Sequence, residues 1–335
     1  MKINYLVTGA YGFVGAHLSR YLNQQGHSVT GIDNCSNYYD PGLKIMRKER
    51  LLRNDGIATL ELDLSQRSEV NDFFKKHEFD IVIHLAAQAG VRIPEHSNYK
   101  YTQDNLVAYQ NVMQATVDSA IRSFLYASSS SVYGNSPNAP YSEKELNLNP
   151  ISFYGMSKLV NEKMASLAST SSNTSMCGMR FFTVYGPWGR PDMAYLRLIY
   201  SALTGKTFHL LGNGEAIRDF TYIDDVVESV YKLSQELHLR AGATNDIVNI
   251  GKGSPESILE MIQIVSECVG KPIMLEHHAH NPFDVQATHA DVSKLSQQIG
   301  FKPEISLREG LRRTVSWATS EISEDQLESW ISSVN

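Results

Sequence analysis

The sequence predicts an α/β protein with a doubly wound parallel sheet and a smaller, mostly helical C-terminal domain. Short apolar segments alternate with helical patterns over the first 182 residues, an order typical of a parallel sheet that binds ligands at its carboxyl edge. A glycine turn follows the first apolar segment, and a run of four serines follows another. From Thr183 onward glycine and proline are frequent, and the chain after Pro255 is mostly helical in pattern.

Composition excludes several classes of protein. The 335 residues are 42% apolar and 20% charged, which is ordinary for a water-soluble globular chain. A net charge of −6 argues against a nucleic-acid-binding surface. No apolar run has the length of a membrane span, and the N-terminus lacks a signal-peptide pattern. Three widely separated cysteines favour reduced thiols, so we expect a cytoplasmic protein without membrane or nucleic-acid partners.

The elements of the sheet are predicted from apolar segments and helical spacing. Strands are expected at 2–8, 28–32, 59–62, 80–85, 124–126, 176–182 and 247–250, and helices at 103–119 and 154–169.

The glycine turn at Gly9, Gly12 and Gly15 lies between a strand and a helical pattern, the context of a dinucleotide site. Gly9 would make the turn, and Gly12 would let the backbone approach a pyrophosphate at the helix N-terminus. Asp33 ends the next strand, 18 residues past Gly15, where an acid binds a ribose 2′-hydroxyl. No Lys or Arg follows before Lys44, so the sequence favours NAD over NADP. Asp33 as a simple turn former is the alternative.

A second constellation joins the serine run 128–131 to Tyr154 and Lys158. Four residues apart on a helix, the tyrosine and the lysine share one face. A nearby ammonium favours the phenolate and lowers the phenol pKa, which makes a proton acceptor usable near neutral pH. The alternative is an ordinary helix with an exposed Tyr and Lys.

Four histidines carry weaker signals. His84 ends an apolar strand, and we interpret it as a buried, hydrogen-bonded side chain rather than a ligand or a base. His277, His278 and His280 lie close together, but their spacing fits no helical or finger pattern, so no metal site is predicted.

These motifs resemble those of the extended short-chain dehydrogenase/reductases that act on nucleotide sugars. The glycine turn, the serines before Val132-Tyr133-Gly134 and the Tyr154-x-x-x-Lys158 pair carry that resemblance. Within the family, four stretches are similar to UDP-glucuronate 4-epimerases: 38–40, 90–92, 181–187 and 188–193. The resemblance implies a Rossmann-type NAD-binding domain over 1–182 plus about 219–252, and a nucleotide-sugar-binding domain over about 183–218 plus 253–335. It also implies a homodimer joined through the helices at 103–119 and 154–169.

The resemblance further implies an activity with named residues. Tyr154 would take the C4 hydroxyl proton, Lys158 would favour its phenolate and bind ribose hydroxyls, and Ser129 would hydrogen-bond the C4 oxygen. The cofactor contacts expected are Gly9, Gly12, Phe13, Val14, Gly15, Asp33, Asn34, Asp63, Leu64, Leu85, Ala86, Ala87, Gln88, Asn105, Tyr154, Lys158 and Phe181. The substrate contacts expected are Arg92, Ser129, Ser130, Thr183, Arg190, Arg218 and Asp284.

The residues at positions 130 and 131 distinguish this chain from close relatives that catalyse other reactions. The similar 4,6-dehydratases and decarboxylases carry acids at these positions, and this chain does not. Epimerisation of UDP-glucuronate to UDP-galacturonate is therefore favoured, with Thr183 and Arg190 holding the carboxylate, since arginine binds carboxylates through two parallel hydrogen bonds. The alternatives are a UDP-glucuronate decarboxylase, a neutral UDP-hexose 4-epimerase and a non-catalytic NAD-responsive binding protein.

Overall fold

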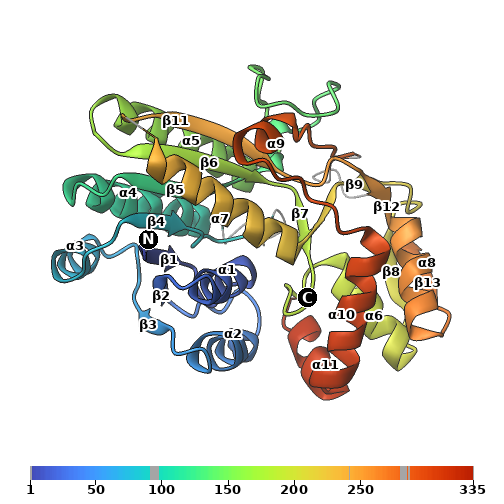
Figure 1. Ribbon diagram of the computed structural model, residues 1–335. Helices are drawn as coiled ribbons and strands as arrows, with labels where there is room; N and C mark the ends of the chain where they lie inside the picture. The colour runs from blue at the N-terminus through green and yellow to red at the C-terminus, as the bar shows by residue number, and fades with distance from the viewer. Residues whose placement is uncertain (1, 91–97, 241, 280–284, 286, 335) are drawn as a thin grey trace.

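A seven-stranded parallel sheet forms the centre of the larger part of the molecule (Figure 1). The computed structural model describes residues 2–90, 98–240, 242–279, 285 and 287–334. The strand order is β11-β6-β5-β4-β1-β2-β3, so the chain runs outward from β1 in both directions, which confirms the doubly wound topology. The strands are β1 (Asn4–Thr8), β2 (Ser28–Asp33), β3 (Ala58–Glu61), β4 (Ile81–His84), β5 (Ser123–Ser129), β6 (Ser175–Phe181) and β11 (Asn245–Ile250).

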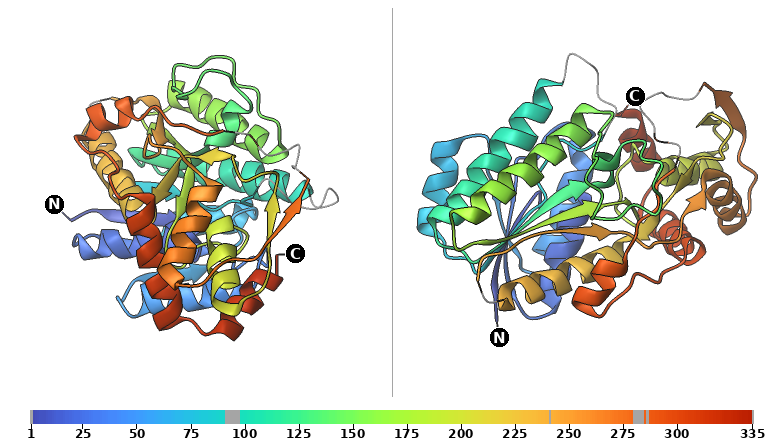
Figure 2. Two further views of the ribbon diagram at one scale, coloured as in Figure 1. Left: turned by 90° about the vertical axis from the view of Figure 1, so that its right-hand side faces the viewer. Right: turned by 90° about the horizontal axis from the view of Figure 1, so that it is seen from above.

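Helices cover both faces of this sheet (Figure 2), because its strands are apolar on both sides. Tyr5 and Val7 of β1 belong to one apolar cluster, together with buried residues of α1 (Phe13–Gln24) and α7 (Ile223–Leu239). Leu6, which points to the other face, packs with buried residues of α3 (Arg67–Lys76), α4 (Ala108–Asp118) and α5 (Phe153–Thr170).

The structure differs from the sequence prediction at two helices. The helix expected at 103–119 begins as a π-helical segment, η3 (Tyr101–Val107), before continuing as α4. A helix that the sequence analysis did not predict, α2 (Pro41–Arg47), follows β2 and continues as η1 (Lys48–Arg53). Asp40 caps α2 by accepting a hydrogen bond from the Gly42 amide at 2.8 Å.

The second region is built from helices and three two-stranded sheets. Its helices are α6 (Ala194–Thr204), α8 (Ile258–Val269), α10 (Leu307–Glu321) and α11 (Glu324–Ser332). Its strand pairs are β7 (Thr183–Tyr185) with β10 (Phe220–Tyr222), β9 (Ile217–Arg218) with β12 (Glu256–Ser257), and β8 (Phe208–Leu211) with β13 (Leu275–His278). The helix α9 (Ser293–Ile299) packs against α7 and β11 of the larger region. Within the described part of the chain, no helix combines the length and apolarity needed to cross a bilayer.

Candidate active site

A cavity of about 800 Å³ runs along the carboxyl edge of the sheet, bounded on the other side by β7, β8 and α6. It is large enough for a dinucleotide end and a sugar nucleotide to meet, and parallel sheets bind ligands at this edge. The predicted residues that line it are Gly9, Gly12, Phe13, Val14, Gly15, Asp33, Asn34, Asp63, Leu64, Leu85, Ala86, Ala87, Gln88, Ser129, Ser130, Tyr154, Phe181, Thr183, Arg190 and Arg218. Arg92 and Asp284 lie outside the described residues.

The glycines of this turn leave no room for a side chain at their positions. A Cβ at Gly9, whose φ is +72°, would lie 2.7 Å from the Ala86 amide nitrogen. A Cβ at Gly15 would lie 2.0 Å from the carbonyl oxygen of Gly9. The first turn of α1 contains no acidic residue, so no carboxylate of that turn competes with a bound anion for its free amides and its positive dipole end. This is a cradle for a diphosphate.

Asp33 ends β2, and its carboxylate joins the glycine turn to the loop that follows β2. It accepts hydrogen bonds from the amides of Tyr11 (3.0 Å) and Cys35 (2.8 Å). Lys44 lies with its Nζ 3.8 Å from Asp33 Oδ1 and lines the same cavity. The expectation that no cation lies near Asp33 is therefore wrong, because α2 folds back and returns Lys44 to the end of β2. The Asp40-Pro41 pair, a cap followed by a helix-starting proline, was the sequence signal for this helix.

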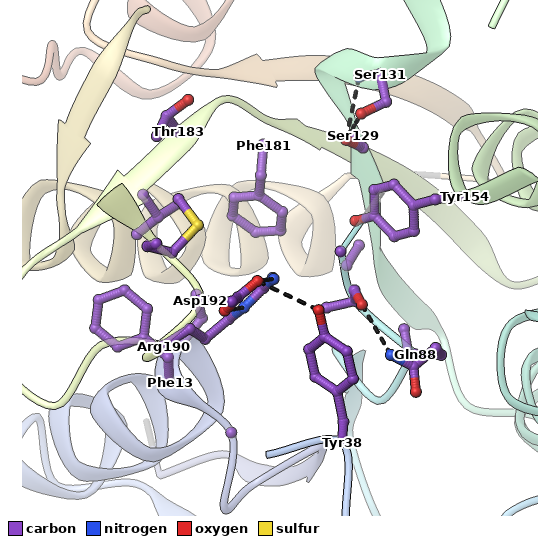
Figure 3. Close-up of a pocket in the computed structure, with 18 of the residues that line it drawn as sticks. Phe13, Tyr38, Gln88, Ser129, Ser131, Tyr154, Phe181, Thr183, Arg190 and Asp192 are labelled. Atoms are coloured by element: carbon purple, nitrogen blue, oxygen red, sulfur yellow. Dashed lines mark hydrogen bonds and ion pairs between the residues drawn. The ribbon is translucent and has the colours of Figure 1, made fainter. Parts of the chain in front are cut away.

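Ser129, Tyr154 and Lys158 are brought together as predicted. Ser129 ends β5, accepts a hydrogen bond from the Ser131 amide and donates one to the Ser131 hydroxyl, each at 3.1 Å. Tyr154 lies in the first turn of α5, which Ser152 caps by accepting from the Gly155 amide. The Lys158 Nζ lies 5.8 Å from the centre of the Tyr154 ring. Figure 3 shows the Tyr154 ring beside Ser129 at the wall of the cavity.

The electrostatics of this group differ from the sequence expectation. Burial raises the pKa of Tyr154, and the opposing influences are the positive charge of Arg190 and a hydrogen bond with Ser129. Burial also lowers the pKa of Lys158 to about 8. Desolvation therefore outweighs the lowering influence on the Tyr154 pKa that the sequence analysis expects from Lys158.

Two predicted cofactor contacts, Asn105 and Lys158, lie behind the cavity wall. Asn105 is 1% exposed, accepts from the Gln88 amide at 2.8 Å and donates to the Ser157 hydroxyl at 2.9 Å. It thus ties the segment after β4 to α5 and positions that wall. The interpretation of His84 is confirmed, since it is buried against the Thr8 hydroxyl at 2.8 Å and burial lowers its pKa to about 3.

Arg190 faces the cavity with half of its guanidinium engaged. Its Nε donates to Asp192 Oδ1 at 3.0 Å, and its Nη2 binds Asp192 Oδ2. Tyr38 donates to the same carboxylate at 3.3 Å (Figure 3). Sequence reasoning missed Asp192 and Tyr38 as partners, although both lie in stretches that carry the family resemblance. The ion pair with Arg190 holds the pKa of the Asp192 carboxyl below its usual value against the effect of burial.

Residues 5–251 match the family model described as the NAD dependent epimerase/dehydratase family. The chain belongs to this family.

Relatives within this epimerase/dehydratase family include UDP-glucuronate 4-epimerase 4 of Arabidopsis thaliana, which is 36% identical over 97% of this chain and 77% of that protein. A solved UDP-glucuronic acid 4-epimerase from Bacillus cereus, in complex with UDP-glucuronic acid and NAD, is 31% identical. The two structures match with a TM-score of 0.87, and the match covers 95% of this chain and 99% of that chain. MoeE5, solved with UDP-glucose and NAD, is 33% identical and matches with a TM-score of 0.84. The match covers 96% of this chain and 100% of that chain. The predicted fold and the resemblance to UDP-glucuronate 4-epimerases are confirmed.

The cavity fits the NAD of this family. The glycines at 9, 12 and 15 and the uncapped N-terminus of α1 suit the diphosphate, and Asp33 suits ribose hydroxyls. The prediction of NAD as the cofactor is thereby confirmed at the level of the family.

Proposed function

We propose that the protein epimerises UDP-glucuronate to UDP-galacturonate at C4 through a 4-keto intermediate. One observation carries the proposal: Ser129 and Tyr154 lie at the wall of a cavity that also holds the NAD cradle, Thr183 and Arg190. Serines at 130 and 131, rather than acids, support epimerisation over dehydration or decarboxylation. Relatives at 31–36% identity that are named as UDP-glucuronate 4-epimerases support the substrate class.

The chain's own residues move the proton. Tyr154 accepts the proton of the C4 hydroxyl and returns it after the sugar has turned, while Ser129 holds the C4 oxygen by a hydrogen bond. When bound, NAD⁺ supplies the hydride acceptor and a positive charge next to the tyrosine. That charge, with Arg190 and Ser129, opposes the burial that raises the Tyr154 pKa.

The carboxylate of the substrate is assigned to Thr183 and Arg190. A 4-keto hexuronic acid is a β-keto acid and loses carbon dioxide when its carboxylate C–C bond aligns with the carbonyl π system. Thr183 is half-buried at the start of β7, and Arg190 uses its Nε and Nη2 for Asp192. We assign the opposite edge of the guanidinium, at Nη1, to the substrate carboxylate.

A neutral UDP-hexose 4-epimerase is the second candidate, and one observation favours it. Asp192 neutralises much of the Arg190 charge, which leaves less attraction for an acidic sugar. MoeE5, a relative in fold and sequence, was solved with UDP-glucose and also with UDP-glucuronic acid, so it favours neither sugar.

Incubation with UDP-glucuronate or UDP-glucose distinguishes these functions. We expect UDP-galacturonate from the first substrate and little turnover of the second. Dominant conversion of UDP-glucose would support the neutral-sugar epimerase. A UDP-pentose product would support the decarboxylase, and no turnover of either substrate would support a binding protein.

The first prediction concerns Arg190→Ala. It should weaken UDP-glucuronate binding by about 1.5–3 kcal/mol, the value of a charge-assisted hydrogen bond. It should also raise the share of turnovers that end in a 4-keto pentose, carbon dioxide and reduced NAD. Arg190→Lys keeps the charge but not the planar fork, so it should restore binding only in part. Normal binding by Arg190→Ala with an unchanged product ratio would favour the neutral sugar.

A further inference from the structure

One face of the β8–β13 pair carries three metal-ligating side chains. His209 lies on β8, opposite Glu276 of the parallel strand β13, and His278 follows two residues after Glu276. Side chains two residues apart on a strand share a face, so all three converge. One ligand atom from each lies within 4.8 Å of the others. Figure 2 shows these two strands side by side at the edge of the second region.

The distances between the ligand atoms are short. His209 Nδ1 lies 2.8 Å from His278 Nε2 and 3.5 Å from Glu276 Oε2, and His278 Nε2 lies 3.2 Å from Glu276 Oε1. At 2.8 Å one of the two imidazole nitrogens must be protonated to donate to the other. A cation held by both nitrogens satisfies them more fully than this single shared proton.

We propose that His209, Glu276 and His278 bind one Zn²⁺ ion. Two imidazoles and one carboxylate form a common zinc donor set, which leaves the fourth tetrahedral position to water. Zinc–nitrogen bonds of about 2.0–2.1 Å place two tetrahedral ligands about 3.3 Å apart, so the imidazoles need to separate by about 0.5 Å. The side chains of His209 and His278 are 63% and 42% exposed, which permits this rotation and admits the water ligand.

The ion would join two strands whose pairing is short. β13 pairs with β8 over four residues, and all four of its residues are exposed. Phe208, His209 and Leu210 of β8 line the cavity, so the site adjoins the wall that the sugar nucleotide would contact. The proposal does not depend on which sugar is bound. His209 is 69 residues from His278 in the chain, which is why the spacing of the histidines near 278 predicted no site.

The strand pair also supplies a matched control. His277 lies between Glu276 and His278 and therefore projects from the opposite face, where its Nδ1 lies 3.3 Å from the Gly212 carbonyl oxygen. Its substitution removes a histidine from the same exposed strand without removing a proposed ligand.

The test is titration of the full-length, tag-free protein with zinc chloride by calorimetry at pH 7.5. We expect one site with a micromolar dissociation constant. His209→Ala and His278→Ala should each weaken it at least tenfold, and His277→Ala should leave it unchanged. Zinc should raise the melting temperature of the wild type and of His277→Ala, but not of His209→Ala. Absence of zinc binding by the wild type, or equal binding by His209→Ala, would overturn the proposal.

Discussion

Burial of ionisable side chains sets the chemistry of the Tyr154–Lys158 pair. Lys158 is 2% exposed and its Nζ faces the Tyr154 ring from 5.8 Å, so both groups lose much of their hydration on folding. Each charged form therefore needs a nearby opposite charge or a hydrogen bond. This arrangement suits a base that is activated only when the cofactor's positive charge is present.

The second prediction is that Tyr154→Phe abolishes turnover and retains the bound NAD. General base catalysis typically contributes 10²–10⁴-fold, and Phe keeps the ring packing against Tyr101. Turnover of UDP-glucuronate and the nucleotide released on denaturation are the two measurements. Retention of more than about a tenth of the activity would place the base elsewhere.

The third prediction concerns Lys158 and pH. Its native pKa of about 8 lies below the ordinary value of 10.5, so the unfolded state binds more protons between these two pH values. Stability contributed by this group is therefore lowest below pH 8 and rises toward pH 10.5. Lys158→Met should be more stable than the wild type at pH 7, by up to about 3 kcal/mol, and should lose that advantage by about pH 10.5.

Urea unfolding of both nucleotide-free proteins at several pH values measures this difference. Other groups titrate equally in the two proteins and cancel in the comparison. A difference in unfolding free energy that stays constant from pH 7 to 10.5 would contradict the depressed pKa.

The residues that could be predicted from the sequence are those whose roles depend on local spacing. Gly9, Asp33, Ser129 and Tyr154 each follow a strand or begin a helix, so the parallel fold alone brings them to one edge. The contacts of Lys44 with Asp33 and of Tyr38 with Asp192 could not be predicted this way. The first depends on how α2 folds back to the end of β2, and the second joins residues 154 positions apart, so short-range patterns record neither.

The same limit applies at the scale of elements. The central strands β1, β4 and β5 of the large sheet are mostly apolar runs of four to seven residues and were predicted near their observed positions. The strands β9 and β12 have two residues each, too few to show a period, and they form only because their partners are held nearby.

Arg47 joins α2 to the loop that carries Arg190. Its guanidinium is fully buried and donates to the carbonyl oxygens of Trp188 and Gly189 at 2.8 Å each, and to the Tyr39 hydroxyl at 2.6 Å. Trp188 has a φ of +61°, which is unfavourable for a bulky residue. The hydrogen bonds of Arg47 to this loop offset the strain and position Arg190.

The fourth prediction is that Arg47→Met lowers the unfolding free energy by roughly 3 kcal/mol, because buried carbonyl oxygens lose their donors. It should also raise the KM for the nucleotide sugar as the loop at 186–193 loosens. Arg50→Met is the matched control: Arg50 is 48% exposed and lies above the Trp188 ring, so the change should stay within about 0.5 kcal/mol. Equal stability of Arg47→Met and the wild type would show that the loop is held by other contacts.

The fifth prediction concerns the whole molecule, which we expect to be a homodimer joined through η3–α4 and α5. Phe153 and Met156 lie one turn apart on α5 and are 64% and 48% exposed, and Val107 of the neighbouring η3 is 38% exposed. Burying such a stripe against its copy gains about 25 cal/mol per Å² of apolar surface, and standard interfaces bury about 800 Å² on each partner. Light scattering should therefore give twice the mass of the chain for the wild type. The double variant Phe153→Glu, Met156→Glu should give the mass of a single chain, because two buried pairs of like charges would face each other across the two-fold axis. Leu146→Glu changes a side chain that is 91% exposed in a loop and should leave the dimer intact. A wild-type monomer at micromolar concentration, or a double variant that still dimerises, would place the contact elsewhere or remove it.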